Sequence, residues 1–176
     1  MVDITIRLAS AADLPAINDI YNHYVRHSTC SYQTDPETPE SRRDWFAHHG
    51  ARHPVTVAVR AAAVPGAGEV VGWGALSAFH PRAAYAHTVE NSVYVRHDLL
   101  RCGVGKALLD DLIVRARQLG HHTVVALIDG EQAASVALHA QRGFVQVGYL
   151  KEAGRKFDRW LDVIYMQLLL NSGPDK

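Results

Sequence analysis

Residues 93–106 read VYVRHDLLRCGVGK and lead from a predicted strand, through a loop with two glycines, into a predicted helix. Glycine lets a backbone approach a phosphate closely, and the free amides at a helix N-terminus favour negative charge. The stretch therefore predicts an anion site between a strand and a helix. The candidate binding residues of the loop are Arg101, Cys102, Gly103, Val104, Gly105 and Lys106.

Two common phosphate-binding motifs do not fit this loop. A P-loop needs glycine at position 100 and serine or threonine at 107, where the chain has Leu100 and Ala107. The dinucleotide fingerprint needs a third glycine at position 108, which is Leu108. A pyrophosphate loop for coenzyme A remains, and so does a glycine turn that binds no ligand.

Hydrophobic periodicity alternates between strand and helix patterns on both sides of the loop. Gly72 and Gly74 predict close backbone approach, and Gly120 and Gly143 end helices. The pattern predicts one α/β domain over residues 1–176, without repeats or linkers. We expect strands over 2–8, 55–59, 70–76, 89–95, 123–128, 144–150 and 161–170, a turn over 65–68, and helices over 11–24 (with Ser10 as N-cap), 41–49, 104–119 and 135–141.

Composition narrows the function classes. The 176 residues are 48% hydrophobic, and 18 Lys and Arg balance 18 Asp and Glu, so no basic field recruits nucleic acid. No apolar run is long enough for a membrane-spanning helix, and the N-terminus lacks the core of a signal peptide. Two cysteines and 11 histidines form no metal motif, so we expect no metal site and a reducing, cytoplasmic setting.

The sequence resembles the GCN5-related N-acetyltransferases, or GNAT family. The family's loop pattern is Q/R-x-x-G-x-G/A, and residues 100–105 match it except that Leu100 replaces the leading polar residue. Three further stretches resemble one branch, the phosphinothricin and methionine sulfone or sulfoximine acetyltransferases. They are TVENSVYV at 88–95, ASVALHAQRGF at 134–144, and the closing segment at 154–163.

This resemblance implies a GNAT fold with a mixed sheet, acetyl-CoA as co-substrate, and direct transfer to the amine of a small amino acid analogue. It also implies a homodimer. Two alternatives stay open: a GNAT enzyme for a polyamine, an aminoglycoside or a protein N-terminus, and a CoA-binding module without catalysis. Within this family, a main-chain N–H of Val93, Tyr94 or Val95 is expected to hold the carbonyl oxygen, with Gln132 and Ser135 near the pantetheine arm.

Two residues carry the expected proton transfers. Glu90 lies in an otherwise apolar strand, where partial burial would raise its pKa and suit it to act as a base. The alternative is an exposed cross-strand residue. His139 occupies the position where many GNAT enzymes carry a tyrosine that protonates the thiolate, and it can act as acid or base. The alternative is a histidine packed in a helix.

The acceptor pocket is expected to lie before Glu90 in the chain. In the related branch, the loop that holds the acceptor corresponds to residues 80–85, and an early loop containing Tyr32 folds over it. Arg82 could clamp a carboxylate, sulfonyl or phosphinyl group with two hydrogen bonds. The expected acceptor-binding residues are Tyr32, Arg82, Ala83, Ala84, Tyr85 and Glu90.

Overall fold

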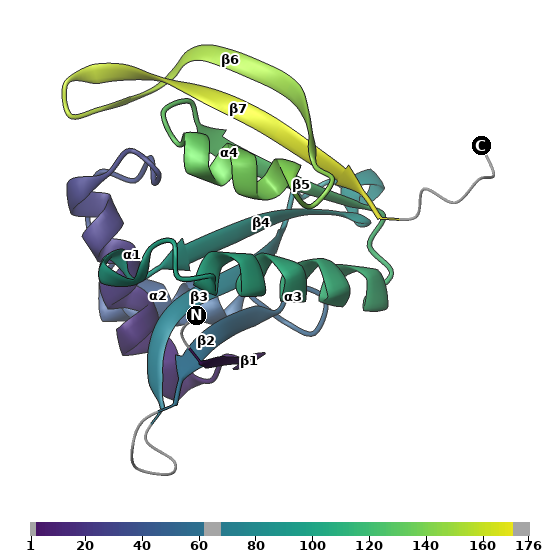
Figure 1. Cartoon of the computed structure of the whole chain (residues 1–176). Coiled ribbons are helices and arrows are strands. Elements are labelled where there is room, and N and C mark those ends of the chain that lie inside the picture. The colour runs from purple at the N-terminus through teal and green to yellow at the C-terminus, as the bar shows by residue number, and fades with distance from the viewer. Residues whose placement is uncertain (1–2, 62–67, 171–176) are drawn as a thin grey trace.

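The computed structural model describes residues 3–61 and 68–170, and Figure 1 shows their arrangement. One seven-stranded mixed sheet has the strand order β1-β2-β3-β4-β5-β7-β6. Its strands are β1 (Ile4–Leu8), β2 (Val55–Arg60), β3 (Glu69–Ala78), β4 (Thr88–Val95), β5 (Thr123–Asp129), β6 (Val145–Lys156) and β7 (Arg159–Leu169). The helices are α1 (Leu14–His27), α2 (Pro39–Ala47), α3 (Val104–Gln118) and α4 (Ala133–Ala140). The expected single-domain mixed α/β fold is confirmed.

The centre of the sheet holds its single parallel pairing among the described strands. Strands β4 and β5 share three residue pairs, from Thr88 opposite Thr123 to Glu90 opposite Val125. The neighbouring antiparallel pairs are longer, because β3 and β4 stay in register from Gly72 opposite Val95 to Ala78 opposite Val89. After Glu90, β4 therefore keeps β3 on one side and loses β5 on the other.

Helices cover both faces of this sheet. Leu14 and Ile17 of α1 pack in one buried cluster with Trp73 of β3. Helix α3 packs so closely on the opposite face that a Cβ on Gly72 would lie 3.0 Å from Val104 Cγ1, and one on Gly74 would lie 2.9 Å from Leu112 Cδ1. The predicted close approach at both glycines is confirmed, and it brings the N-terminus of α3 against the middle of the sheet.

Helix α2 begins two residues before the predicted start at position 41. Thr38 takes the N-cap position and accepts a hydrogen bond from the main-chain N–H of Ser41 at 3.1 Å. Pro39 occupies the first helical position, where a missing N–H costs nothing. The prediction placed this proline in a loop, because it did not consider that proline is favoured at the first position of a helix.

The two closing strands run further than predicted and form the long hairpin in Figure 1. Phe157 and Asp158 make its turn with φ of +51° and +59°, the conformation of a type I′ hairpin. Such turns usually have the sequence Asn-Gly, and because this one does not, the turn was not predicted. A bulge between Leu150 and Gly154 bends the hairpin.

Other local predictions fare well. Gly120 and Gly143 have φ of +74° and +85°, as expected for residues that end helices. Ser10 precedes a short 3-10 turn, Ala11–Asp13, that leads into α1. The turn predicted over 65–68 lies mostly outside the described residues. Within those residues, no helix is long and apolar enough to cross a membrane.

Candidate active site

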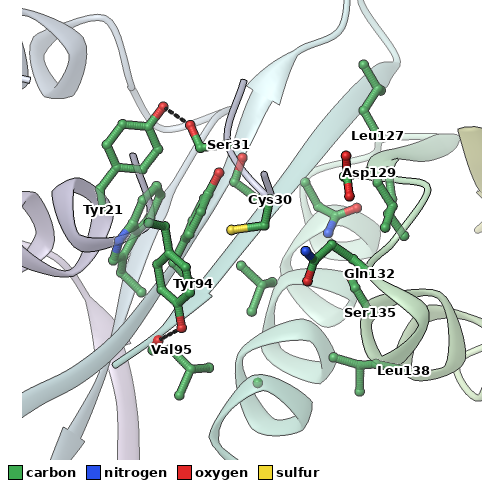
Figure 2. A pocket seen from close by; sticks show the side chains of 18 of the residues that line it. Tyr21, Cys30, Ser31, Tyr94, Val95, Leu127, Asp129, Gln132, Ser135 and Leu138 are labelled. Carbon is green, nitrogen blue, oxygen red and sulfur yellow. Dashed lines mark hydrogen bonds between the residues drawn. The ribbon is translucent and has the colours of Figure 1, made fainter. Parts of the chain in front are cut away.

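A cavity of about 1160 Å³ opens where β4 and β5 part. Figure 2 shows Tyr21, Ser31 and Tyr94 on one side of it and Gln132, Ser135 and Leu138 on the other. Four residues of the glycine loop, both proposed catalytic residues and Tyr32 also line it, whereas Cys102 and Val104 of that loop do not. The split in the sheet thus brings together residues that the sequence separates by more than a hundred positions.

The main chain of β4 offers unpaired polar groups to this cavity. The N–H of Arg96 donates to the main-chain oxygen of Val71 in β3 at 2.9 Å. Main-chain groups of alternate residues in a strand point to opposite sides, so those of Val93 and Val95 point away from β3 and toward the gap. The oxygen of Val95 accepts a hydrogen bond from the hydroxyl of Tyr24. The N–H of Val93 therefore faces the gap where β5 would otherwise accept it. That position suits a donor to a carbonyl oxygen.

The glycine loop closes one end of the cavity. Gly103 precedes α3 with φ of +90°, a conformation that side-chain-bearing residues rarely adopt, and it leaves the first amides of the helix free. Arg101, Gly105 and Lys106 join Gly103 in the cavity wall. The structure thus brings together a loop, a helix N-terminus and two cations, and anion binding by them stays a prediction.

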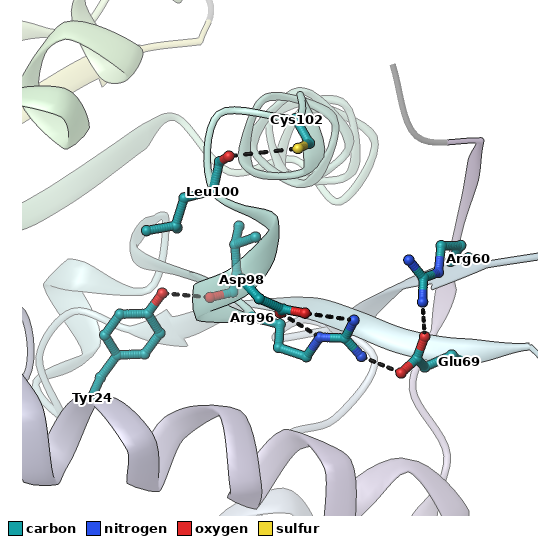
Figure 3. Close-up of polar contacts among 8 residues, drawn as sticks. Tyr24, Arg60, Glu69, Arg96, Asp98, Leu100 and Cys102 are labelled. Carbon is teal, nitrogen blue, oxygen red and sulfur yellow. Dashed lines mark hydrogen bonds and ion pairs between the residues drawn. The ribbon is translucent and has the colours of Figure 1, made fainter.

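A network of ion pairs holds the approach to this loop, as Figure 3 shows. Arg96 contacts Asp98 at 2.7 Å and also Glu69, which pairs with Arg60 from the neighbouring strand. The Cys102 thiol donates to the oxygen of Leu100 at 3.5 Å. These contacts fix the short turn His97–Leu99 between β4 and the loop.

Glu90 is the last residue of β4 that pairs with β5. It stands opposite Ser77 of β3, and alternation places its side chain on the same sheet face as Tyr94. Burial raises the pKa of this carboxyl above its ordinary value of 4.5. No hydrogen bond or ion pair to its side chain is found in the described part of the chain. The alternative of an ordinary exposed residue does not fit this environment.

His139 lies in α4 with 4% of its surface exposed. Its Nδ1 donates to the main-chain oxygen of Ser135 at 2.8 Å, and its Nε2 accepts from the Asn91 amide nitrogen at 3.0 Å. Burial lowers the pKa of the imidazole below 6.5, and both contacts fit the neutral ring. The ring is both packed and cavity-lining, and its part in proton transfer stays a prediction.

The side chains of Glu90 and His139 lie on opposite faces of β4. Asn91 follows Glu90 directly, so its side chain points to the other face, where it contacts His139. Residue spacing alone gave no signal for this Asn91 contact. The two proposed proton-transfer groups therefore approach the gap from its two sides and do not contact each other.

Sequence reasoning also missed Asp129, which ends β5 at the cavity. Tyr32 donates to the main-chain oxygen of Asp162 at 2.8 Å and lies 3.1 Å from Asp129 Oδ2, while Thr29 donates to Oδ1 at 3.0 Å. These bonds tie the loop after α1 to β5 and β7. A polar residue at the carboxyl end of a buried central strand was the available signal.

The predicted acceptor loop does not join the cavity. Ala83–Tyr85 form an exposed 3-10 turn after Arg82, and Tyr85 packs edge-on against Phe79 with ring centroids 5.7 Å apart. None of Arg82, Ala83, Ala84 and Tyr85 lines the cavity formed by the described residues. Their role in acceptor binding stays a prediction. Gln132 and Ser135, by contrast, line the cavity as expected.

Comparison with known proteins gives the family. The profile of the Acetyltransferase (GNAT) family matches residues 17–144. The chain belongs to the GNAT acetyltransferase family. Among GNAT relatives, it is 42% identical to an L-methionine sulfoximine/L-methionine sulfone acetyltransferase from Pseudomonas paraeruginosa, over 95% of each chain. It is 39% identical to a phosphinothricin N-acetyltransferase from Alcaligenes faecalis, over 96% of this chain and 84% of the relative.

A solved GNAT structure has the same architecture. The phosphinothricin acetyltransferase from Sinorhizobium meliloti in complex with acetyl-CoA superposes with a TM-score of 0.89 at 36% identity, over 98% of this chain and 91% of that one. The GNAT fold and its family resemblance are thereby confirmed. No group of three or more potential metal ligands occurs among residues 3–61 and 68–170.

The raised pKa of Glu90 predicts a stability effect. A carboxyl with a folded-state pKa above its unfolded value stabilises the fold at low pH, and this contribution is lost as pH rises through the folded pKa. Glu90→Gln removes the buried charge. We expect the variant to be more stable than the wild type near neutral pH, with the difference vanishing near pH 4.5, in urea unfolding curves across pH.

Glu69→Gln is the matched control. Hydrogen bonds from Arg96 and Arg60 lower the pKa of Glu69, so this carboxylate stabilises the fold above its ordinary pKa. Its replacement should destabilise the protein near neutral pH, opposite in sign to Glu90→Gln. Equal or reduced stability of Glu90→Gln at neutral pH would contradict the burial argument.

Proposed function

We propose that this protein is an acetyl-CoA-dependent N-acetyltransferase for the amino group of a small amino acid analogue, such as methionine sulfoximine, methionine sulfone or phosphinothricin. The observation that carries the proposal is the split between β4 and β5. It joins an anion-binding loop, free main-chain groups and a carboxyl of raised pKa in one cavity. The named activities of the relatives support the choice of acceptor.

Acetyl-CoA fits the described residues. The free amides at Gly103–Gly105 and the cations Arg101 and Lys106 suit a pyrophosphate. The unpaired N–H of Val93 suits the thioester oxygen. Gln132 and Ser135 line the cavity, where they would contact the pantetheine arm. Cys102, whose thiol bonds to Leu100, has no role in direct transfer.

The reaction needs one base on the acceptor side. Glu90 accepts a proton from the ammonium, directly or through water, because its raised pKa brings it toward neutrality. The free amine attacks the thioester carbon, the C–N bond forms and the C–S bond breaks. The second proton that the nitrogen loses ends on the departing thiolate, which leaves as the CoA thiol. His139, on the opposite face of β4, is the proposed group for this second proton, as the acid to the sulfur or as the base to the nitrogen.

The same proposal includes a homodimer in a reducing cytoplasm. The β6–β7 hairpin exposes large apolar side chains to solvent, and a surface of this kind usually marks an interface. Both cysteines are free thiols. The relative exposures of the apolar side chains on the hairpin reach 55% to 61% at Val147, Val145 and Trp160.

Trp160→Asp tests the dimer. A charge at a buried interface position would lack a partner, so we expect the variant to sediment as a monomer where the wild type sediments as a dimer. Lys151→Ala changes an exposed charge on the same hairpin and should leave the dimer intact. A wild type that sediments as a monomer at all concentrations would refute the dimer.

Gly103→Val tests the cofactor site. A branched side chain is strained at φ of +90° and would meet a phosphate there, although no protein atom lies within 4 Å of its Cβ position. Acetyl-CoA at 100 times its Kd should stabilise the wild type by about 2.7 kcal/mol, and the variant by far less, in thermal shift measurements. Gly50→Val, which has open space and no left-handed φ, should keep the full shift.

Steady-state kinetics with a panel of amines tests the activity. The three amino acid analogues should have a much higher kcat/KM than spermidine or an aminoglycoside. Glu90→Gln should lower kcat by about 10²–10⁴, with a smaller loss at higher pH where the amine is already neutral, and should keep the acetyl-CoA shift. His139→Ala should lower kcat as well. If His139 protonates the thiolate, a donor with a better leaving thiol should reduce that defect.

A best substrate among the polyamines would refute the acceptor assignment. If both variants keep the wild-type kcat, neither Glu90 nor His139 takes part in proton transfer. Acetyl-CoA binding without transfer to any amine would favour the non-catalytic alternative.

A further inference from the structure

A buried lysine lies next to the turn of the β6–β7 hairpin. Lys156 is the last residue of β6, pairs with Arg159 of β7, and has 4% of its surface exposed. Lysine is almost never fully buried unless its ammonium has a partner. Burial lowers the pKa of this amine below its ordinary value of 10.5, and in the described part of the chain no carboxylate forms an ion pair with it. Its ammonium therefore depends on other acceptors.

Two main-chain oxygens of a distant segment supply those acceptors. The segment is residues 28–33, which follow α1 and are called the cavity loop below. Lys156 Nζ donates to the oxygen of Ser28 at 2.8 Å and to that of Ser31 at 2.6 Å. The nitrogen also lies 5.1 Å from the ring centroid of Phe157, whose face attracts a cation. One ammonium thus joins two points of the cavity loop to the hairpin.

The hairpin contacts the cavity loop at two further points. The ring of Tyr32 lies so close to Gly154 of β6 that a Cβ there would be 2.5 Å from Tyr32 Cδ2. The Tyr32 hydroxyl donates to the main-chain oxygen of Asp162 in β7 at 2.8 Å. Both strands of the hairpin therefore hold the cavity loop, and Lys156 supplies the charged contact.

The cavity loop forms a wall of the cavity on the side of Glu90. The Ser31 hydroxyl donates to the Tyr21 hydroxyl at 2.9 Å, and the Tyr21 ring packs edge-on against Tyr94 with centroids 5.2 Å apart. Tyr94 lies on the same sheet face as Glu90. Figure 2 shows Ser31 beside Tyr21 and across the cavity from Gln132. Four residues of the cavity loop line the cavity: Cys30, Ser31, Tyr32 and Gln33.

We propose that Lys156 is a positioning residue, which holds the cavity loop against the hairpin and so fixes the wall that an acceptor amine meets beside Glu90. This rests on the proposed function and adds a residue that does not itself touch the acceptor. Among the described residues, Lys156 Nζ bonds to the cavity loop and not to the glycine loop at 101–106. Its loss should therefore weaken acceptor binding and leave acetyl-CoA binding intact.

The thiol of Cys30 reports the position of the cavity loop without turnover. Burial raises the pKa of this thiol, and the charge of Lys156 lowers it in part. If the loop stayed in place, Lys156→Met would remove that charge and slow alkylation by iodoacetamide, because the thiolate is the reactive form. If the loop is released, the thiol regains solvent, its pKa falls, and alkylation should become roughly tenfold faster or more. The two outcomes have opposite signs.

Peptide mass spectrometry measures the alkylation of each cysteine separately. Cys102 lies outside the cavity loop and bonds to the main-chain oxygen of Leu100, so it serves as the internal reference. Its alkylation rate should be the same in the wild type and in Lys156→Met.

Isothermal titration measures the effect on binding. Methionine sulfone and phosphinothricin are titrated into the protein saturated with CoA, and CoA is titrated into the free protein. A displaced wall misplaces the acceptor, so Lys156→Met should raise the acceptor Kd by roughly 10- to 100-fold and leave the CoA Kd within about twofold of wild type. A general loss of structure would weaken both ligands.

Gly154→Ala is a second variant that keeps Lys156. The added Cβ would displace the Tyr32 ring from the hairpin, and Gly154 has no left-handed φ that would strain an alanine. It should also speed the alkylation of Cys30 and raise the acceptor Kd. This variant keeps the test valid if Lys156→Met does not fold.

Two matched controls lie on the same strand. Lys151→Met makes the same replacement at an exposed position of β6. Gly148→Ala places a Cβ 3.4 Å from Tyr165, an ordinary van der Waals distance. Both controls should keep the wild-type alkylation rate and the wild-type acceptor Kd.

Failure of the positioning role and failure of the proposed function give different results. Alkylation of Cys30 at or below the wild-type rate in the folded variants would overturn the positioning role. Faster alkylation with an acceptor Kd within about twofold of wild type would overturn it too, and so would a wild type that binds neither analogue. A wild type that binds the analogues and transfers no acetyl group would refute the proposed function and leave the positioning role standing, because neither readout needs turnover.

Discussion

Once β4 and β5 part after Glu90 and Val125, a central strand of the sheet has main-chain groups without a neighbouring strand. A buried N–H without a partner costs free energy, so such a gap persists only where a ligand or water completes the bonding. Val93 and Val95 line this gap, and Tyr24 already satisfies the oxygen of Val95. The glycine loop, α3 and α4 are arranged around the same opening. The incomplete pairing of one strand thus defines both the cavity and what can fill it.

The alternation of β4 then divides the chemistry between two faces. Glu90 points to the face of α1 and α2, where Tyr21, Trp73 and Arg42 gather. Asn91, its neighbour in sequence, points to the face of α4 and fixes His139. A single step along a strand therefore separates the carboxyl of the proposed base, with a raised pKa, from a neutral imidazole with a lowered one. Opposite burial effects on an acid and a base keep both groups uncharged more of the time than in water.

Local sequence patterns predicted much of the fold correctly, because the conformation of each such segment depends on a few neighbouring residues. The left-handed glycines at 103, 120 and 143 and the close approach at Gly72 follow from glycine's missing side chain. The Arg42 and Asn91 environments could not be predicted, because their partners come from elements 20 to 50 residues away that only the folded sheet brings together. The role of Arg82 as acceptor clamp follows from its loop in the related branch and from its two-donor guanidinium, and it stays a prediction, whereas the burial of Arg42 leaves no local mark in the sequence.

The buried polar groups beside this gap carry unfavourable local terms. Burial raises the pKa of the Glu90 carboxyl, and within residues 3–61 and 68–170 the Arg42 guanidinium makes no ion pair and the Trp73 Nε1–H makes no hydrogen bond. Burying a polar or charged group without a full set of partners costs free energy, so these groups lower the stability of the fold. In the proposed reaction, an acceptor ammonium beside Glu90 would give this carboxyl a charged partner, and part of the cost of its burial would then favour acceptor binding.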